Sequence, residues 1–312
     1  MIFCLISAGL LRADNGWQDH ILSLTWENDA TAGTDRHYTE GAWISYLSRD
    51  DALPGWLDRL SNHLPAPGIE IEAKKFGLLA GQELYTPENL RASGVVTNDR
   101  PYAGWLYAGF TLQRRGKVSA SWLAMENLRL DLGIIGPEAL PELTQDITHH
   151  SKPRGWSHQL RTELAFALRY NRQYFYRITD RDNPWCADVL PFFNASGGTV
   201  STFLGGGGTL RAGYHIPNEF EAGGEGGPSR YGAYLFTRAE GRYVIRNIFL
   251  DGNTFTHSAH IGKEPWVGEL RAGLTFVLKS VEVTAAQTLR TREFKGQKSN
   301  DSYGTATVTL KF

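Results

Sequence analysis

Apolar and polar residues alternate along several segments of the chain, most clearly in its second half. In segment 267–278, one face carries leucine, alanine and phenylalanine, and the other carries glutamate, arginine, glycine and threonine. The last segment, which ends at Phe312, sets alanine, valine and leucine against threonine, and segments 106–112 and 127–134 carry similar apolar stripes. A period of two is typical of β-strands that bury one face. The sequence therefore predicts an all-β protein.

Two all-β architectures satisfy this pattern: a sandwich with a shared apolar core, or a barrel with an apolar outer face and a polar interior. About twelve strand-like segments are visible, an even number that is typical of outer-membrane barrels. The terminal strand ending in Phe312 resembles the C-terminal signature of that class. A membrane-spanning barrel strand needs only about ten residues, whereas a spanning helix needs ~18 consecutive apolar ones. We therefore expect a transmembrane antiparallel β-barrel of about twelve strands in preference to a sandwich.

Composition and charge narrow the partners and the domain organisation. The net charge of −1 gives no bulk attraction to nucleic acid, which is not an expected partner. Residues 1–13 are apolar and end near a small residue, so they read as a signal segment, truncated because a basic start is missing; a short buried strand is the alternative. Residues 14–312 would then form a single barrel domain. Without the first segment Cys186 is the only cysteine, which excludes an intrachain disulfide.

Polar residues concentrate beside aromatic ones in four segments, 26–29, 35–41, 99–105 and 136–159. If consecutive strands pair, the first two segments flank one connection at one rim of the barrel. Asn28, Asp29, Thr39 and Glu40 would offer hard oxygen ligands of the kind that calcium takes. Asn and Asp at a strand end are also ordinary turn residues, and strict alternation would place Asn28 and Asp29 on opposite faces. Spacing alone therefore leaves a metal site and a plain turn both open.

The fourth segment contains two adjacent histidines, His149 and His150. A histidine can activate water at neutral pH, although a solvated loop histidine is the simpler interpretation of either residue. The chain has no Gly-x-Ser-x-Gly motif and no cysteine with a local histidine partner, so nothing indicates a covalent nucleophile. If the protein is a hydrolase, attack by an activated water is the more economical mechanism.

Together these segments resemble the outer-membrane lipid A 3′-O-deacylase (LpxR-type) family over nearly the whole mature chain. The resemblance implies a twelve-stranded barrel in the Gram-negative outer membrane and a calcium-dependent ester hydrolase that removes the 3′-linked acyloxyacyl group of lipid A. The residues that carry the resemblance are those at 27–29, 38–41, 99–105, 133–137, 155–156, 159–160, 247–255 and 290–294.

The resemblance also implies roles for individual residues. Asn28, Asp29 and Thr39 match polar active-site positions, with Asn28 and Asp29 as calcium ligands. His149 matches the catalytic base, with His150 as the alternative. The substrate-binding candidates are two arginines, Arg91 and Arg100; Arg91 is the nearest basic residue to a family lysine expected after Tyr85.

The sequence departs from the family pattern, and other functions remain open. A glutamate that the family places after its histidine has no clear equivalent in the short segment from His149 to Trp156. The rival functions are a non-enzymatic barrel, acting as a pore or passive scaffold, and a barrel esterase that acts on phospholipid. In each case we expect a monomer in the outer membrane, and for the deacylase the partner is lipopolysaccharide.

Overall fold

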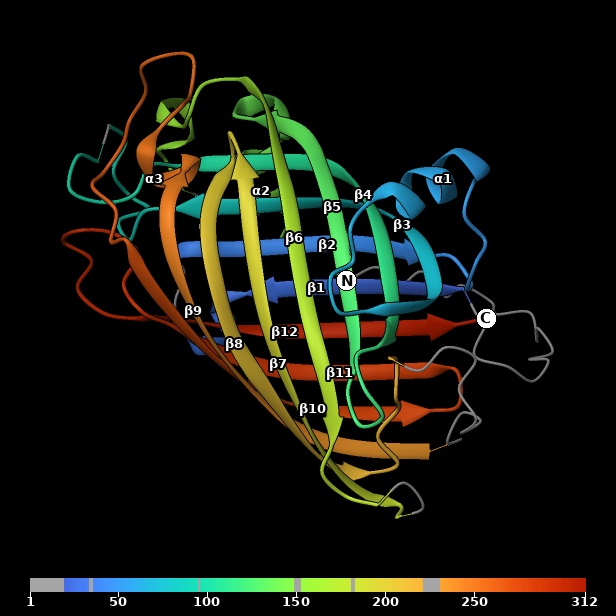
Figure 1. The fold of residues 1–312 in the computed structure, drawn as a ribbon. Coiled ribbons are helices and arrows are strands. Elements are labelled where there is room, and N and C mark those ends of the chain that lie inside the picture. Colours follow the sequence, from blue (N-terminus) through green and yellow to red (C-terminus); the bar gives the residue numbers. More distant parts are fainter. Residues whose placement is uncertain (1–19, 34–35, 95, 149–152, 181–182, 221–230) are drawn as a thin grey trace.

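The computed structural model describes residues 20–33, 36–94, 96–148, 153–180, 183–220 and 231–312, and these form a closed antiparallel β-barrel of twelve strands (Figure 1). Every strand pairs with its neighbours in sequence, and the first strand also pairs with the last, which closes the barrel. This confirms the predicted fold, whereas the predicted signal segment 1–13 lies outside the described residues. The strands are β1 (Ile21–Asn28), β2 (His37–Leu47), β3 (Glu70–Thr86), β4 (Ala103–Lys117), β5 (Leu123–Ile135), β6 (Glu163–Arg177), β7 (Trp185–Gly198), β8 (Ser201–Tyr214), β9 (Tyr231–Asn247), β10 (Trp266–Leu278), β11 (Val281–Arg290) and β12 (Asp301–Lys311).

The alternation read from the sequence sorts side chains between the outer face and the interior. On β10, Leu270 and Phe276 are exposed on the outer face, while Glu269 and Arg271 line the interior and Thr275 is buried. The outer face thus carries apolar side chains and the interior polar ones, as a membrane barrel requires. No helix in the described part of the chain is long and apolar enough to cross a membrane.

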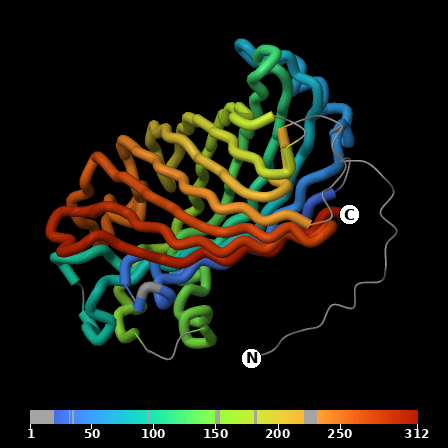
Figure 2. Tube along the Cα trace, turned by 90° about the horizontal axis from the view of Figure 1, so that it is seen from below, coloured from blue at the N-terminus to red at the C-terminus, as the bar shows by residue number. Residues whose placement is uncertain are grey.

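The connections between strands gather at two ends of the barrel. The end with the C-terminus, here called the terminal end, carries α1 (Gly55–His63). The opposite end, here called the site end, carries α2 (Pro141–Thr148), α3 (Ile248–Asp251) and the 3₁₀ turns η1 (Asp29–Ala32), η2 (Pro137–Ala139) and η3 (Trp156–His158). In Figure 2 the teal and green connections of the site end lie away from the C-terminus.

Aromatic side chains pack across the interior at the site end. Phe249 of α3 stacks on Tyr85 with the ring centroids 4.1 Å apart, and Tyr38 meets Tyr303 edge-on at 4.9 Å. Offset and edge-to-face contacts of this kind add about 0.5–1.5 kcal/mol each beyond the area they bury. They hold α3 and the ends of β2, β3 and β12 together, so the strand ends that carry the polar segments have fixed positions.

Candidate functional site

The first strand ends at Asn28 because its side chain caps the following turn. Asn28 Oδ1 accepts a hydrogen bond of 2.7 Å from the amide of Ala30, and the chain then enters η1. Asp29 Oδ2 accepts one of 2.5 Å from the amide of Arg36, which returns the chain toward β2. The alternation that would separate the two side chains stops here, and both are buried. Asn28 and Asp29 therefore form one polar corner at the site end.

A β-bulge at Thr39 interrupts the regular alternation of side chains on β2. Trp43 lines the barrel interior and Gly41 lies on the same face, so strict alternation would send Tyr38 outward. The pairing of β2 with β3 shifts between Tyr38 and Glu40, and Tyr38 consequently faces the interior. A Cβ at Gly41 would lie 2.0 Å from the Tyr38 hydroxyl oxygen, so a side chain at this position would require the buried Tyr38 ring to move.

Glu40 keeps the outward face of the regular alternation and lies opposite Asn28 in the register of β1 and β2. Glu40 Oε1 accepts a hydrogen bond of 3.2 Å from the indole of Trp26, which is exposed on the outer face. Glu40 Oε2 accepts one of 2.7 Å from the hydroxyl of Thr148, the last residue of α2. A buried carboxylate on the outer wall thus joins the strand to the helix.

The helix α2 lies against the outside of the barrel. Thr144, one turn before Thr148, donates a hydrogen bond of 2.9 Å to Gln82 Oε1, and Gln82 is on the outward face of β3. Pro141 packs so closely on β4 that a Cβ at Gly104 would lie 2.6 Å from its ring. The polar corner is therefore covered from outside by α2, next to the exposed apolar side chains of the wall.

A second set of contacts joins α2 to the connection that contains η3. Gln145 is fully buried, and its Oε1 accepts a hydrogen bond of 2.9 Å from the indole of Trp156. The Trp156 ring meets Tyr102 edge-on at 4.8 Å. These contacts bring the third and fourth polar segments of the sequence to the same place as the first two.

Three of the predicted site residues lie at the polar corner, and the two histidines lie outside the described residues. Asn28, Asp29 and Thr39 lie together at this corner, with Thr39 buried and its hydroxyl 2.7 Å from that of Thr86. His149, the predicted base, and its alternative His150 lie outside the described residues. The residue before them, Thr148, is the one that contacts Glu40.

The two substrate-binding candidates differ in exposure. Arg91 is exposed in the connection between β3 and β4. Arg100 is fully buried, with its Nη1 3.3 Å from Glu293 Oε2 and its guanidinium 4.4 Å from the centre of the Tyr85 ring. Burial opposes ionisation of Glu293, but Arg290 and Arg100 outweigh it and hold the pKa of that carboxyl below its ordinary value. Substrate binding by Arg91 and by Arg100 stays a prediction. In the structure, the contacts of Arg100 with Glu293 and Tyr85 stabilise the barrel interior.

A buried cluster joins three connections at the site end. His37 Nδ1 lies 2.7 Å from Asp301 Oδ1, and its Nε2 lies 3.4 Å from Asp99 Oδ1. Burial would raise the pKa of Asp99, but the hydrogen bond with His37 and the bonds from the amides of Glu88 and Arg100 lower it. The cluster fastens the start of β2 to the connections that precede β4 and β12.

The donor atoms at the polar corner fit a calcium ion by their chemistry. Asn28, Asp29, Thr39 and Glu40 can offer side-chain oxygens, two of them from carboxylate groups, and oxygen is the ligand type that calcium prefers. Within the described residues no group of three or more His, Cys, Asp or Glu side chains could hold a metal ion. Amide, hydroxyl or main-chain oxygens would therefore have to complete the ligand set.

Sequence reasoning missed the roles of Thr144, Thr148 and Gln82. Thr144 and Thr148 are four residues apart, so on a helix they share a face, and that polar pair was visible in the sequence. Their partners on the wall, Gln82 and Glu40, could not be identified from the sequence, because the strand register shows which residues of β2 and β3 lie beside α2.

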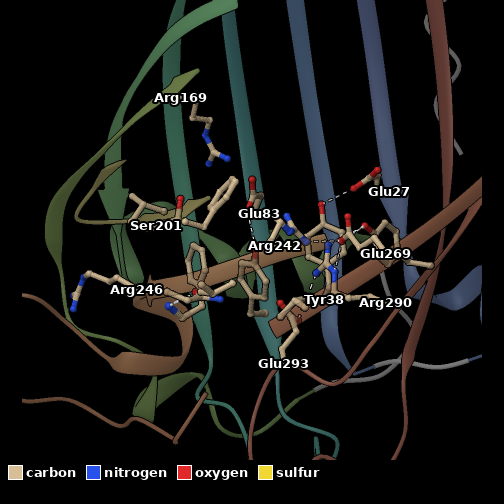
Figure 3. Close-up of a pocket in the computed structure, with 18 of the residues that line it drawn as sticks. Glu27, Tyr38, Glu83, Arg169, Ser201, Arg242, Arg246, Glu269, Arg290 and Glu293 are labelled. Carbon is tan, nitrogen blue, oxygen red and sulfur yellow. Dashed lines mark hydrogen bonds and ion pairs between the residues drawn. The ribbon is translucent and has the colours of Figure 1, made fainter. Parts of the chain in front are cut away.

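The barrel interior contains a cavity of about 530 Å³, separated from the outer-wall site by the sheet (Figure 3). Tyr38 and Tyr85 lie toward its site end, and Trp43 and Tyr107 lie deeper. The neighbouring residues Glu27 and Asn28 illustrate the separation: Glu27 lines the cavity, and Asn28 pairs with Glu40 of the outer-wall site. Seven arginines and four glutamates also line the cavity: Arg129, Arg169, Arg238, Arg242, Arg246, Arg271, Arg290, Glu27, Glu83, Glu269 and Glu293.

The family model described as outer membrane protein LpxR matches residues 1–312 of the chain. The chain belongs to this family. Its place is therefore the Gram-negative outer membrane, and the apolar outer face of the barrel meets lipid. None of the curated proteins matches the sequence significantly.

Solved structures support the same fold for this LpxR family member. LpxR from Salmonella typhimurium aligns with a TM-score of 0.72 at 20% identity, covering 94% of this chain and all of the other (100%). The β-domain of the Bordetella autotransporter BrkA covers 96% of this chain and 100% of that one, at a TM-score of 0.47 and 11% identity. The first match confirms the twelve-stranded barrel, and the second carries no further argument.

Proposed function

We propose that the protein is an ester hydrolase that removes the 3′-linked acyloxyacyl group of lipid A, using calcium. The observation that carries this proposal is the position of the polar corner. Buried Asn28, Asp29 and Glu40 lie at the site end of the wall, beneath α2, and Glu40 and Trp26 face the outside. A substrate held in the membrane can reach such a site laterally without entering the barrel. Family membership supports lipid A as that substrate.

The residues of the chain would divide the chemical work as follows. His149 directly follows Thr148, whose hydroxyl is bonded to Glu40, so the proposal assigns His149 as the base that takes a proton from the attacking water. Asn28 and Asp29, with Thr39, would hold calcium, which when bound supplies positive charge to stabilise the developing oxyanion. The indole of Trp26 and the apolar residues beneath it would orient the acyl chains along the wall.

Mass spectrometry of lipid A incubated with the purified, detergent-folded protein tests this proposal. We expect loss of one acyloxyacyl unit in the presence of calcium and no loss with a chelator. His149→Ala should abolish the reaction, and His150→Ala serves as the matched control that retains it. Loss of activity in His150→Ala alone would contradict the assignment of the base.

The two rival functions give different results in the same system. An esterase that acts on phospholipid would release fatty acid from phospholipid vesicles and leave lipid A intact. A pore or passive scaffold would leave both lipids intact, and a pore would conduct ions across a planar bilayer. Either result would contradict the proposed function.

A further inference from the structure

The interior cavity presents cationic groups more than anionic ones, although acids and arginines are both present. The side chains of Arg129, Arg169 and Arg238 are each 30–31% exposed, and that exposure is toward the cavity. Their carboxylate partners are covered, with Asp131 0% and Glu240 8% exposed. A molecule that enters the cavity would therefore meet guanidinium groups before carboxylates.

Two of these arginines share a single acid. Arg129 donates its Nε and Nη2 to the two oxygens of Asp131 at 2.7 and 2.9 Å, and Arg169 donates its Nε to the same carboxylate at 2.9 Å. Arg129 and Arg169 are register partners on β5 and β6. One buried negative charge thus lies between two positive ones. In Figure 3 the guanidinium of Arg169 points into the cavity.

Two further arginines that line the cavity lie on β9. Arg238 Nη2 lies 3.0 Å from Glu240 Oε2. Arg246 donates to the carbonyl oxygens of Thr199 and Gly252 at 3.0 and 3.2 Å. Carbonyl and hydroxyl oxygens, here also that of Thr254 at 2.8 Å, orient a guanidinium without neutralising it, and in Figure 3 the guanidinium of Arg246 lies at the left edge of the cavity.

The acids elsewhere in the cavity already have hydrogen-bond or ion-pair partners. Glu27 accepts hydrogen bonds from Tyr38, Arg271 and Thr305, and Glu269 lies 2.9 Å from Arg242 and 2.5 Å from Arg290. Glu83 accepts a hydrogen bond of 2.8 Å from the hydroxyl of Tyr85 and interacts electrostatically with Arg169 and Arg129, so it is the carboxylate that faces these two arginines. In Figure 3 these acids lie on the right and centre of the cavity, and Arg169, Ser201 and Arg246 lie on the left.

We infer that the cavity is a second binding site, for a small molecule that carries phosphate or carboxylate groups. Its volume of about 530 Å³ is that of a small-molecule site. The planar guanidinium groups of Arg129 and Arg169 suit paired hydrogen bonds to such oxyanions. The aromatic rings of Tyr107, Phe203 and Phe249 supply apolar wall for the rest of the ligand. This site is independent of the outer-wall site.

Calorimetric titration of the full, detergent-folded protein tests the inference. The probes are inorganic phosphate, glucose 6-phosphate and citrate, with glucose as the uncharged control. We expect the three anions to bind, glucose not to bind, and the affinity for the anions to fall as salt is raised. The double variant Arg169→Gln/Arg238→Gln should weaken anion binding at least tenfold, while lipid A hydrolysis stays at the wild-type rate. In this variant Asp131 still has Arg129 as its ion-pair partner, so we expect the fold to be retained.

Arg177→Gln is the control for the change on β6, because it removes one guanidinium charge from the strand that carries Arg169. Arg177 faces the interior nearer the terminal end and lies 3.7 Å from Asp188, which keeps Arg211 at 2.7 Å. We expect Arg177→Gln to bind the anions as the wild type does. Absence of binding by the wild-type protein would overturn the inference, as would equal weakening in Arg177→Gln. Failure of lipid A hydrolysis with anion binding intact would contradict only the proposed function.

Discussion

The outer-wall site and the interior cavity lie on opposite sides of one sheet and stabilise their acids differently. On the outer wall, Glu40 is held by the indole of Trp26 and the hydroxyl of Thr148. In the cavity, Glu269 is held by the guanidinium groups of Arg242 and Arg290. Hydrogen bonds from neutral groups leave a carboxylate its charge, whereas arginine partners offset it. Under the proposed function, the carboxylates of Asp29 and Glu40 would recruit a cation to the outer-wall site, and the partly exposed arginines would recruit an anion to the cavity.

Glu27 and Asp29 are two residues apart, and substitutions at these two positions test the difference between the two sites most directly. Asp29→Asn should lower the rate of lipid A hydrolysis by about 10²–10³, since it removes a charge proposed to hold the group that stabilises the oxyanion. Glu27→Gln should leave that rate unchanged and lower stability instead, because Arg271 loses its carboxylate at 2.8 Å. Rates come from mass spectrometry of lipid A, and stability from urea unfolding. Equal rate losses in the two variants would remove the distinction between the two faces.

A change confined to the cavity should affect folding alone. Asp131→Asn leaves Arg129 and Arg169 without their shared carboxylate, and both guanidiniums are partly solvated, so we expect a loss of about 2 kcal/mol in unfolding free energy. Lipid A hydrolysis should remain at the wild-type rate once the barrel has folded. Urea titration and the hydrolysis assay on the same preparation measure both. A hundredfold lower rate in a folded variant would show that the two regions are coupled.

The contact between Thr148 and Glu40 should matter less than the proposed ligands. Thr148→Val removes the hydroxyl that joins α2 to the wall and keeps the shape of the side chain. A hydrogen bond to a charged group contributes about 1.5–3 kcal/mol, so we expect roughly a tenfold or greater fall in rate through displacement of α2. Ser157→Ala, in the neighbouring turn η3, is the control and should be silent. A Thr148→Val variant with the wild-type rate would show that this contact does not position the helix.

The smallest effect should come from pH at the site end. The pKa of Asp99 is lowered in the folded protein, so its contribution to stability is present above its unfolded value of 3.8 and is lost as pH falls through the lower folded value. The melting temperature should therefore hold steady between about pH 5 and 6 and fall below about pH 4. Asp99→Asn should reduce that acid-dependent fall by a few degrees at most. An unchanged pH profile in Asp99→Asn would contradict the assignment.

The fold was predictable from the sequence because alternation directly reports which side chains face outward. Leu270 and Phe276 were assigned to one face by that pattern, and the structure places them on the outer face. The grouping of Asn28 and Asp29 with Thr39 followed from pairing consecutive strands and from the family resemblance, and the structure brings these residues to one corner. Their catalytic and ligand roles stay predictions.

The position of the corner on the outer wall could not be predicted from the sequence. It depends on the docking of α2 outside β3 and β4, through Gln82 and Pro141. The bulge at Thr39 adds a second change that alternation does not predict, because it turns Tyr38 into the interior while Glu40 keeps the outward face. The cationic character of the cavity could not be predicted for a related reason. It follows only from the structure, in which Asp131 is covered and Arg169 is partly exposed.

Photo-crosslinking from the two faces of the sheet measures the route of the substrate most directly. A benzophenone amino acid replaces Ile44, which is exposed on the outer face below Glu40, or Phe203, which lines the cavity. Both variants are placed in proteoliposomes that contain lipid A and are then irradiated. Lipid A attached to position 44 and absent from position 203 is the result that lateral access predicts. Lipid A attached to position 203 and absent from position 44 would contradict a site that works from the outer wall.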